Sequence, residues 1–121
     1  MERVFIQTDE FADEIKVFKN PADLLIDIEQ EVLRDIKKSP TSRDIIQGTG
    51  GFTKVRIAFK SEGRGKSGSA RVIYLDCPRP KRTFLVMIYS KSKVGNISEA
   101  GKNALKEMAK ELKAWQPNVK K

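Results

Sequence analysis

Any chemistry that this chain performs has to come from lysine, arginine and tyrosine. The sequence contains no histidine, a single cysteine (Cys77), and 24 Lys and Arg residues against 16 Asp and Glu. Without histidine, the usual proton shuttle and the commonest metal ligand are both missing. Cys77 and the scattered carboxylates show no metal-ligand spacing, and no Ser-His or Cys-His pair exists. We therefore expect no metal site and no cofactor, and a reaction that cations can support.

The first candidate residues lie on a segment with a strand pattern. In Lys54–Lys60, cations alternate with apolar residues, as in a half-buried strand with one face in the core. Lys54 and Arg56 then share the displayed face, which is positive. Such a face suits a polyphosphate chain.

Two later strand-like segments carry further candidates. Arg71 lies in Ala70–Asp76, next to core residues, and Tyr89 lies near the end of Thr83–Ser90. Neighbouring antiparallel strands bring such positions together, so these groups could converge on one concave patch. A basic face that only binds its ligand has the same pattern. The remaining candidates follow the last strand: Lys91 and Lys93.

Positive charge is concentrated in the second half of the chain. Residues 1–53 contain 7 Lys and Arg against 11 Asp and Glu, whereas residues 54–121 contain 17 against 5. The net charges of −4 and +12 predict a strongly positive region that attracts nucleic acid or another acidic partner. For the C-terminal helix, lysines that merely solvate the surface explain the charge equally well.

A glycine-rich segment matches the sequence pattern of a nucleotide-binding motif. Gly63–Gly68 matches G-x-G-x-x-G, but that motif requires a helix after it, and here another strand follows. A P-loop is excluded because its first glycine would fall on Lys60. We interpret the segment as a hairpin whose Arg64 and Lys66 can contact a phosphate backbone.

The element pattern predicts an α+β fold in a single domain, residues 1–121. We expect a two-layer structure: an antiparallel β-sheet, made of a three-strand meander plus an N-terminal strand, with the helices packed on one face. Thr83–Ser90 is the most apolar segment and is expected to be the central strand. The other expected elements are a strand at Arg3–Thr8 and helices at Asp9–Phe18, at Asn20–Lys38 with Asn20 as its cap, and from a Ser98 cap to Pro117.

The expected location is the cytoplasm. No apolar run approaches the roughly 18 to 20 residues that span a bilayer, and the first residues are too polar for a signal peptide. A single cysteine also fits a protein without disulfides. We expect no membrane partner.

Three segments together resemble the HigB-like branch of the RelE/ParE toxin superfamily, over about the last two thirds of the chain. They are Ile46–Arg56 (I-Q-G-T-G-G-F-T-K-V-R), Gly65–Tyr74 (G-K-S-G-S-A-R-V-I-Y) and Ile88–Lys91 (I-Y-S-K).

This resemblance implies a type II toxin–antitoxin toxin that cleaves mRNA on the ribosome, in the A site of the 30S subunit beside 16S rRNA. In such relatives the ribose 2′-OH attacks the adjacent phosphate without a metal, leaving a 2′,3′-cyclic phosphate and a 5′-OH. The implied protein partner is a cognate antitoxin. Two alternatives stay open: a ParE-like inhibitor of DNA gyrase, and a non-catalytic relative that only binds RNA.

The resemblance also implies roles for individual residues. Arg71 matches the family's phosphate-contacting arginine, Lys54 and Arg56 match its basic pair, and Lys91 matches a basic position after the last strand. We assign proton transfer to Lys54 or Lys91, because neighbouring cations favour a neutral amine. RelE proper has a base-stacking tyrosine beyond the last strand, whereas Val94–Ile97 contains no aromatic residue. The predicted RNA-binding residues are Arg56, Arg64, Lys66, Tyr89 and Lys93.

Overall fold

The computed structural model describes residues 3–58, 69–79, 81–90 and 98–115. The element order agrees with the sequence pattern, with one short strand, β2, added before the meander. The strands are β1 (Val4–Gln7), β2 (Asp44–Ile45), β3 (Thr53–Ala58), β4 (Ser69–Cys77) and β5 (Arg82–Ser90). The α-helices are α1 (Asp9–Glu14), α2 (Pro21–Ile36) and α3 (Glu99–Ala114), with 3-10 turns at Ile15–Val17 and Pro40–Ser42.

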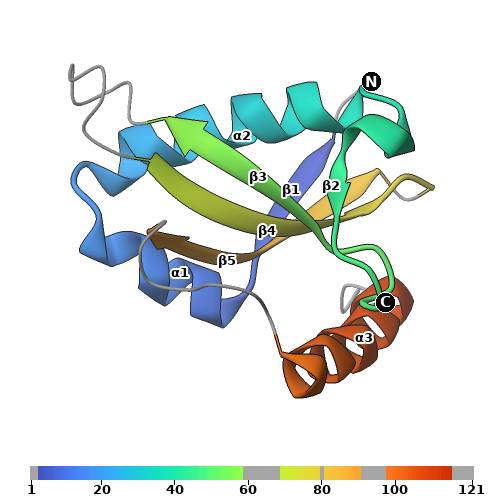
Figure 1. Ribbon diagram of the computed structural model, residues 1–121. Helices are drawn as coiled ribbons and strands as arrows, with labels where there is room; N and C mark the ends of the chain where they lie inside the picture. Colours follow the sequence, from blue (N-terminus) through green and yellow to red (C-terminus); the bar gives the residue numbers. More distant parts are fainter. Residues whose placement is uncertain (1–2, 59–68, 80, 91–97, 116–121) are drawn as a thin grey trace, which may run out of the picture.

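The described strands form one mixed sheet in the order β1-β5-β4-β3-β2 (Figure 1). β3, β4 and β5 form the expected antiparallel meander, and β1 runs parallel to β5. The α+β fold class is therefore confirmed. The expectation that β5 is the central strand is wrong, because β1 pairs with its outer edge and leaves β4 in the middle.

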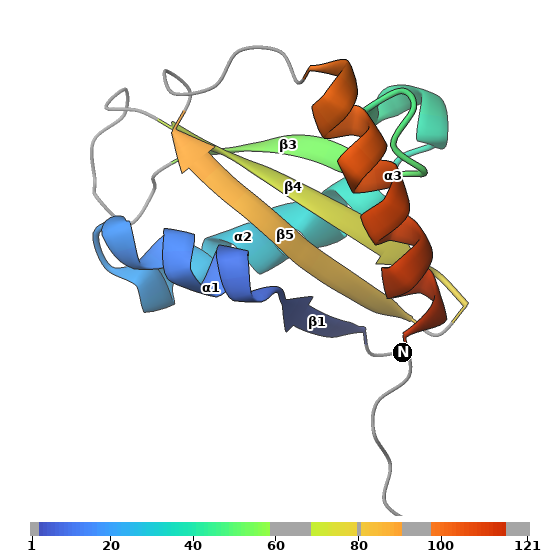
Figure 2. The same ribbon diagram turned by 90° about the horizontal axis from the view of Figure 1, so that it is seen from below.

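Helices cover both faces of the sheet, which corrects the expected two-layer arrangement with every helix on one face (Figure 2). α1 and α2 pack on the face that carries Val72 and Tyr74. Leu105 of α3 packs on the opposite face, with Ile73 and Leu75. Because β4 has apolar side chains at consecutive positions, both faces of the sheet carry apolar residues that a helix can cover.

The helix starts agree only partly with their expected caps. Ser98 caps α3 as expected, since its hydroxyl accepts a hydrogen bond from the Gly101 backbone N–H at 3.1 Å. Asn20 instead adopts a left-handed backbone with φ of 50° before α2 and makes no side-chain cap bond. Pro21 occupies the first turn of α2, where its missing N–H costs nothing.

The glycine cluster before β3 lets the chain approach α3 closely. Gly50 has φ of +82°, and a Cβ atom built on it would lie 3.1 Å from the Ala109 Cβ atom of α3. Lys113, also on α3, donates a hydrogen bond to the Gly50 carbonyl at 2.7 Å. Glycine is required here because a side chain would be strained by the backbone angle and obstructed by the helix.

A second contact holds the C-terminal end of α3. The Trp115 ring packs edge-on against Phe84 of β5, with ring centroids 5.9 Å apart. The Arg82 guanidinium lies 5.2 Å from the Trp115 ring centroid and donates a hydrogen bond to the Trp115 carbonyl at 2.8 Å. α3 is thus fixed to the sheet near the start of β5.

A buried polar contact ties α2 to the middle of the sheet. The Tyr74 hydroxyl of β4 donates a hydrogen bond to the Asp35 carboxylate of α2, and Lys38 forms an ion pair with Asp35 at 3.2 Å. Burial, and then the bond to Asp35, raise the pKa of the Tyr74 phenol. Asp35 is only 4% exposed, so it depends on these partners to offset its lost hydration.

Candidate nucleic-acid interface

The strand register places Arg56, Arg71 and Tyr89 in one row across the sheet. Arg71 of β4 lies directly opposite Arg56 of β3 on one side and opposite Tyr89 of β5 on the other. Residues directly opposite each other in antiparallel strands point to the same face, with Cβ atoms about 4.5–5.5 Å apart. We call these three residues the arginine row. The structure therefore brings three of the predicted site residues together.

Ser69 lies between the two arginines. Its hydroxyl oxygen accepts hydrogen bonds from Arg56 Nε at 3.2 Å and from Arg71 Nη1 at 3.4 Å. Among the described residues, no carboxylate forms an ion pair with either guanidinium group. Two like charges at such close range are relieved by an anion that bonds to both, and arginine binds phosphate through two parallel N–H groups.

Tyr89 completes the row as a hydrogen-bond donor. Its ring is partly buried against the α3-side core cluster. Burial raises the pKa of the Tyr89 phenol, and the nearby Arg71 charge opposes this effect. The phenol therefore keeps its proton at neutral pH and can donate a hydrogen bond to a phosphate oxygen.

Lys54 lies on the same face, two residues before Arg56 on β3. It is directly opposite Ile73 of β4 on one side and Asp44 of β2 on the other. Its side chain is partly exposed, so its ammonium group is accessible to solvent and to a ligand. Lys91, Lys93, Arg64 and Lys66, the other predicted site residues, lie outside the described residues.

An apolar groove of about 320 Å³ adjoins the arginine row on the same face. Its floor contains Tyr89 itself, together with Met87 and Ile73. Glu14, at the end of α1, is the acidic residue in its lining. We call this space the α3 groove, because the rest of its lining comes from α3: Gly101, Ala104, Leu105 and Met108.

Sequence reasoning missed the α3 groove and Glu14. Glu14 stands in a run of acidic residues at the start of the chain, and nothing in its sequence spacing relates it to Arg71. Its position becomes clear only from the fold, where its carboxylate oxygen Oε1 accepts a hydrogen bond from the Ile88 backbone N–H at 3.0 Å. This N–H lies on β5 beyond the last residue that pairs with β1.

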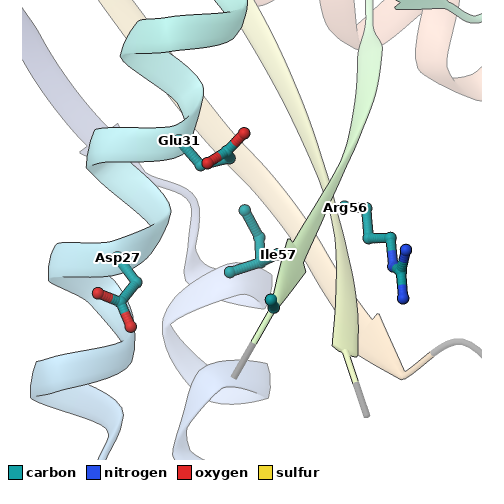
Figure 3. Close-up of a pocket in the computed structure, with 5 residues that line it drawn as sticks. Asp27, Glu31, Arg56 and Ile57 are labelled. Atoms are coloured by element: carbon teal, nitrogen blue, oxygen red, sulfur yellow. The ribbon is translucent and has the colours of Figure 1, made fainter. Parts of the chain in front are cut away.

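A second hollow, of about 250 Å³, lies between α2 and β3 but does not suit a phosphate (Figure 3). Asp27 and Glu31 of α2 line it with carboxylates. Figure 3 shows Ile57 pointing toward α2 and Arg56 pointing away from the helix. The alternation of β3 therefore directs Arg56 to the α3 side of the sheet.

The described residues offer neither a metal site nor a membrane-spanning helix. They contain no group of three or more Cys, Asp or Glu side chains arranged to hold a metal ion. No helix within them combines the length and hydrophobicity needed to cross a bilayer.

Comparison with protein families agrees with this geometry. The model of a family described as the RelE toxin of the RelE/RelB toxin–antitoxin system matches residues 41–119, more than half of the chain. The matched range includes the whole arginine row, and β1, which precedes it, pairs with β5 inside it. This chain therefore belongs to the RelE toxin family, and its family implies an antitoxin as a partner.

Proposed function

We propose that this toxin is a HigB-like, ribosome-dependent mRNA endonuclease that cleaves translated mRNA without a metal ion. The observation that supports the proposal most directly is the arginine row, in which two guanidinium groups share the Ser69 hydroxyl as acceptor. This arrangement offers fixed positive charge at the place where a scissile phosphate would bind. Family membership supports the same reading.

The proposed reaction needs charge stabilisation and two proton transfers. The ribose 2′-oxygen attacks the adjacent phosphorus, the bond from phosphorus to the 5′-oxygen breaks, and a 2′,3′-cyclic phosphate and a 5′-hydroxyl result. The 2′-hydroxyl loses one proton and the departing 5′-oxygen gains one. The phosphate oxygens gain negative charge in the transition state, and Arg56 and Arg71 stabilise it without reorganising.

Lysines are the proposed proton carriers. Lys54 shares the face of the arginine row, so we keep it as a candidate together with Lys91. Tyr89 is proposed to orient the phosphate rather than to remove a proton, because burial keeps its phenol protonated. Arg64, Lys66 and Lys93 are proposed to bind flanking RNA.

Replacing Arg71 with alanine tests the proposal. The toxin is expressed in cells with translation active or blocked, and cuts in a reporter mRNA are mapped by primer extension. We expect Arg71→Ala to reduce cleavage on the order of 10²- to 10³-fold, the usual loss for a transition-state donor. We expect cleavage by the unaltered toxin only while translation is active.

The matched control is Lys106→Ala, which removes the same charge from an exposed position on α3. It should leave cleavage unchanged, and circular dichroism should show that both variants are folded. Undiminished cutting by Arg71→Ala would refute the site assignment. Intact mRNA together with DNA damage would refute mRNA cleavage and favour gyrase inhibition.

A further inference from the structure

We propose that the α3 groove binds a single RNA base beside the phosphate at the arginine row, and that Glu14 selects bases whose edge carries hydrogen-bond donors. The inference rests on the proposed function, since it assigns a base subsite to the same RNA-binding face.

Tyr89 connects the two parts of this surface. It lies directly opposite Arg71 in the strand register and also forms part of the groove floor. A phosphate bonded to Arg71 would therefore have its ribose beside Tyr89 and its base at the mouth of the α3 groove. One nucleotide can occupy both places, so the groove continues the phosphate site.

The lining of the groove suits a flat, weakly polar ring. Gly101 and Ala104 have little or no side chain, and this leaves open space between α3 and β5. Met87 and Met108 border that space with flexible thioether groups, which adapt to flat ligands and contact aromatic rings favourably. A volume of about 320 Å³ lies at the small end of ligand pockets, which suits one base better than a larger ligand.

Glu14 gives the groove a chemical preference. The bond from the Ile88 N–H to Oε1 fixes the carboxylate, and no described residue donates to Oε2. An ionised carboxylate only accepts hydrogen bonds. A carboxylate beside a polyanion is unfavourable unless donors face it, so the groove favours a base edge that presents N–H groups.

The four bases differ in what they offer to Glu14. Guanine presents an imino and an amino donor side by side, which matches the two oxygens of a carboxylate. Adenine and cytosine each present one amino group. Uracil presents a single imino N–H flanked by two carbonyl oxygens, which the carboxylate repels. We therefore expect guanine to bind best and uracil worst.

Methionine methyl groups report directly on the groove. The chain has three methionines, and two of them, Met87 and Met108, line the groove. The full chain, labelled with 13C at the methionine methyl groups, is titrated with 2′-O-methyl trinucleotides that differ in one base. The blocked 2′-oxygen cannot attack, so binding is measured without cleavage.

We expect guanine-containing trinucleotides to shift the Met87 and Met108 signals. Guanine should bind on the order of tenfold more tightly than uracil, the discrimination of one good base contact. Glu14→Gln should bring this ratio close to one, because the amide turns a donor toward the base while its oxygen still accepts from Ile88. The matched control, Asp13→Asn, removes the same charge at a side chain that is 82% exposed and should keep the ratio.

The proposal is overturned if no trinucleotide shifts Met87 or Met108, or if Glu14→Gln keeps the guanine preference. These outcomes are distinguishable from failure of the proposed function. If mRNA is never cut but the methyl signals shift as expected, only the endonuclease proposal fails. If mRNA is cut and the methyl signals stay fixed, only the base subsite fails.

Discussion

Replacing Gly50 with alanine should destabilise the fold more than the same replacement at Gly48, because only Gly50 lies close to a rigid part of α3, the Ala109 Cβ atom. The two residues have nearly the same backbone angle, with φ of +82° and +80°. Alanine enters this left-handed region at a cost of about 1–2 kcal/mol. Alanine also lowers the conformational entropy of the unfolded chain, and this stabilises the folded state by about 0.4–1 kcal/mol. The net backbone cost is therefore about 1 kcal/mol at either position.

The packing around the new methyl group separates the two variants. At position 50 the Cβ atom would lie 3.1 Å from Ala109 Cβ, on a rigid helix. At position 48 the nearest atom is the flexible Lys102 side chain, 4.0 Å away. Overpacking a rigid contact costs about 1–3 kcal/mol. We expect Gly48→Ala to lose about 1 kcal/mol in total and Gly50→Ala about 2–4 kcal/mol.

Urea unfolding followed by Trp115 fluorescence measures the difference. With a denaturant slope of about 2 kcal/mol per molar, Gly50→Ala should unfold at a midpoint about 0.5–1.5 M below that of Gly48→Ala. Adding Ala109→Gly to Gly50→Ala should recover the free energy of unfolding that is lost through overpacking, although a glycine inside the helix itself costs about 1 kcal/mol. Equal midpoints for the two alanine variants, or a double-mutant cycle without coupling, would refute the close contact between this loop and α3.

Further predictions concern three side chains. Tyr74→Phe should lower the free energy of unfolding by about 1–3 kcal/mol, because Asp35 loses its buried hydroxyl donor. The melting temperature should fall, and an unchanged value would contradict this. Since the folded state raises the Tyr74 pKa, the tyrosine stabilises the fold below its unfolded pKa of about 10, and that contribution is lost as the pH rises further. The phenylalanine variant should therefore lose less stability than the unaltered chain at alkaline pH. Trp115→Ala should lower the free energy of unfolding by about 1–2 kcal/mol, because the ring contacts, including that with Arg82, are lost. Amide hydrogen exchange at the end of α3 should become faster, and unaltered exchange there would count against the contact. Cys77 is buried and its thiol pKa is raised by burial, so iodoacetamide should label it much more slowly in the folded protein than in urea, and equal rates would contradict the burial.

Local pattern predicted most of the elements. The alternation of Lys54–Lys60 located β3, the apolar stripes located α2 and α3, and Ser98 was correctly recognised as a cap. Asn20 precedes α2 as predicted, but its backbone is left-handed and its side chain makes no cap bond. The pattern also placed Lys54 and Arg56 on one face, since strand alternation depends only on the chain itself.

The layer arrangement could not be predicted in the same way. An apolar stripe shows that a helix needs a partner but not which face of a sheet supplies it. β4 and β5 are both apolar at consecutive positions, so their sequences could not show which is central or which helix covers which side. The choice of central strand depends on β1, which pairs with β5 from the far end of the chain.

For the candidate site too, some features follow from the sequence and others only from the tertiary structure. The sequence by itself restricted the candidate chemistry, because a chain without histidine and rich in lysine and arginine leaves cations as the expected functional groups. The alternation of one strand places two of these cations on the same face. Only the tertiary structure decided that Arg56, Arg71 and Tyr89 form one row, since register depends on pairing between strands. Only the tertiary structure also placed Glu14 beside them, because its contact joins α1 to β5, 74 residues away in the sequence.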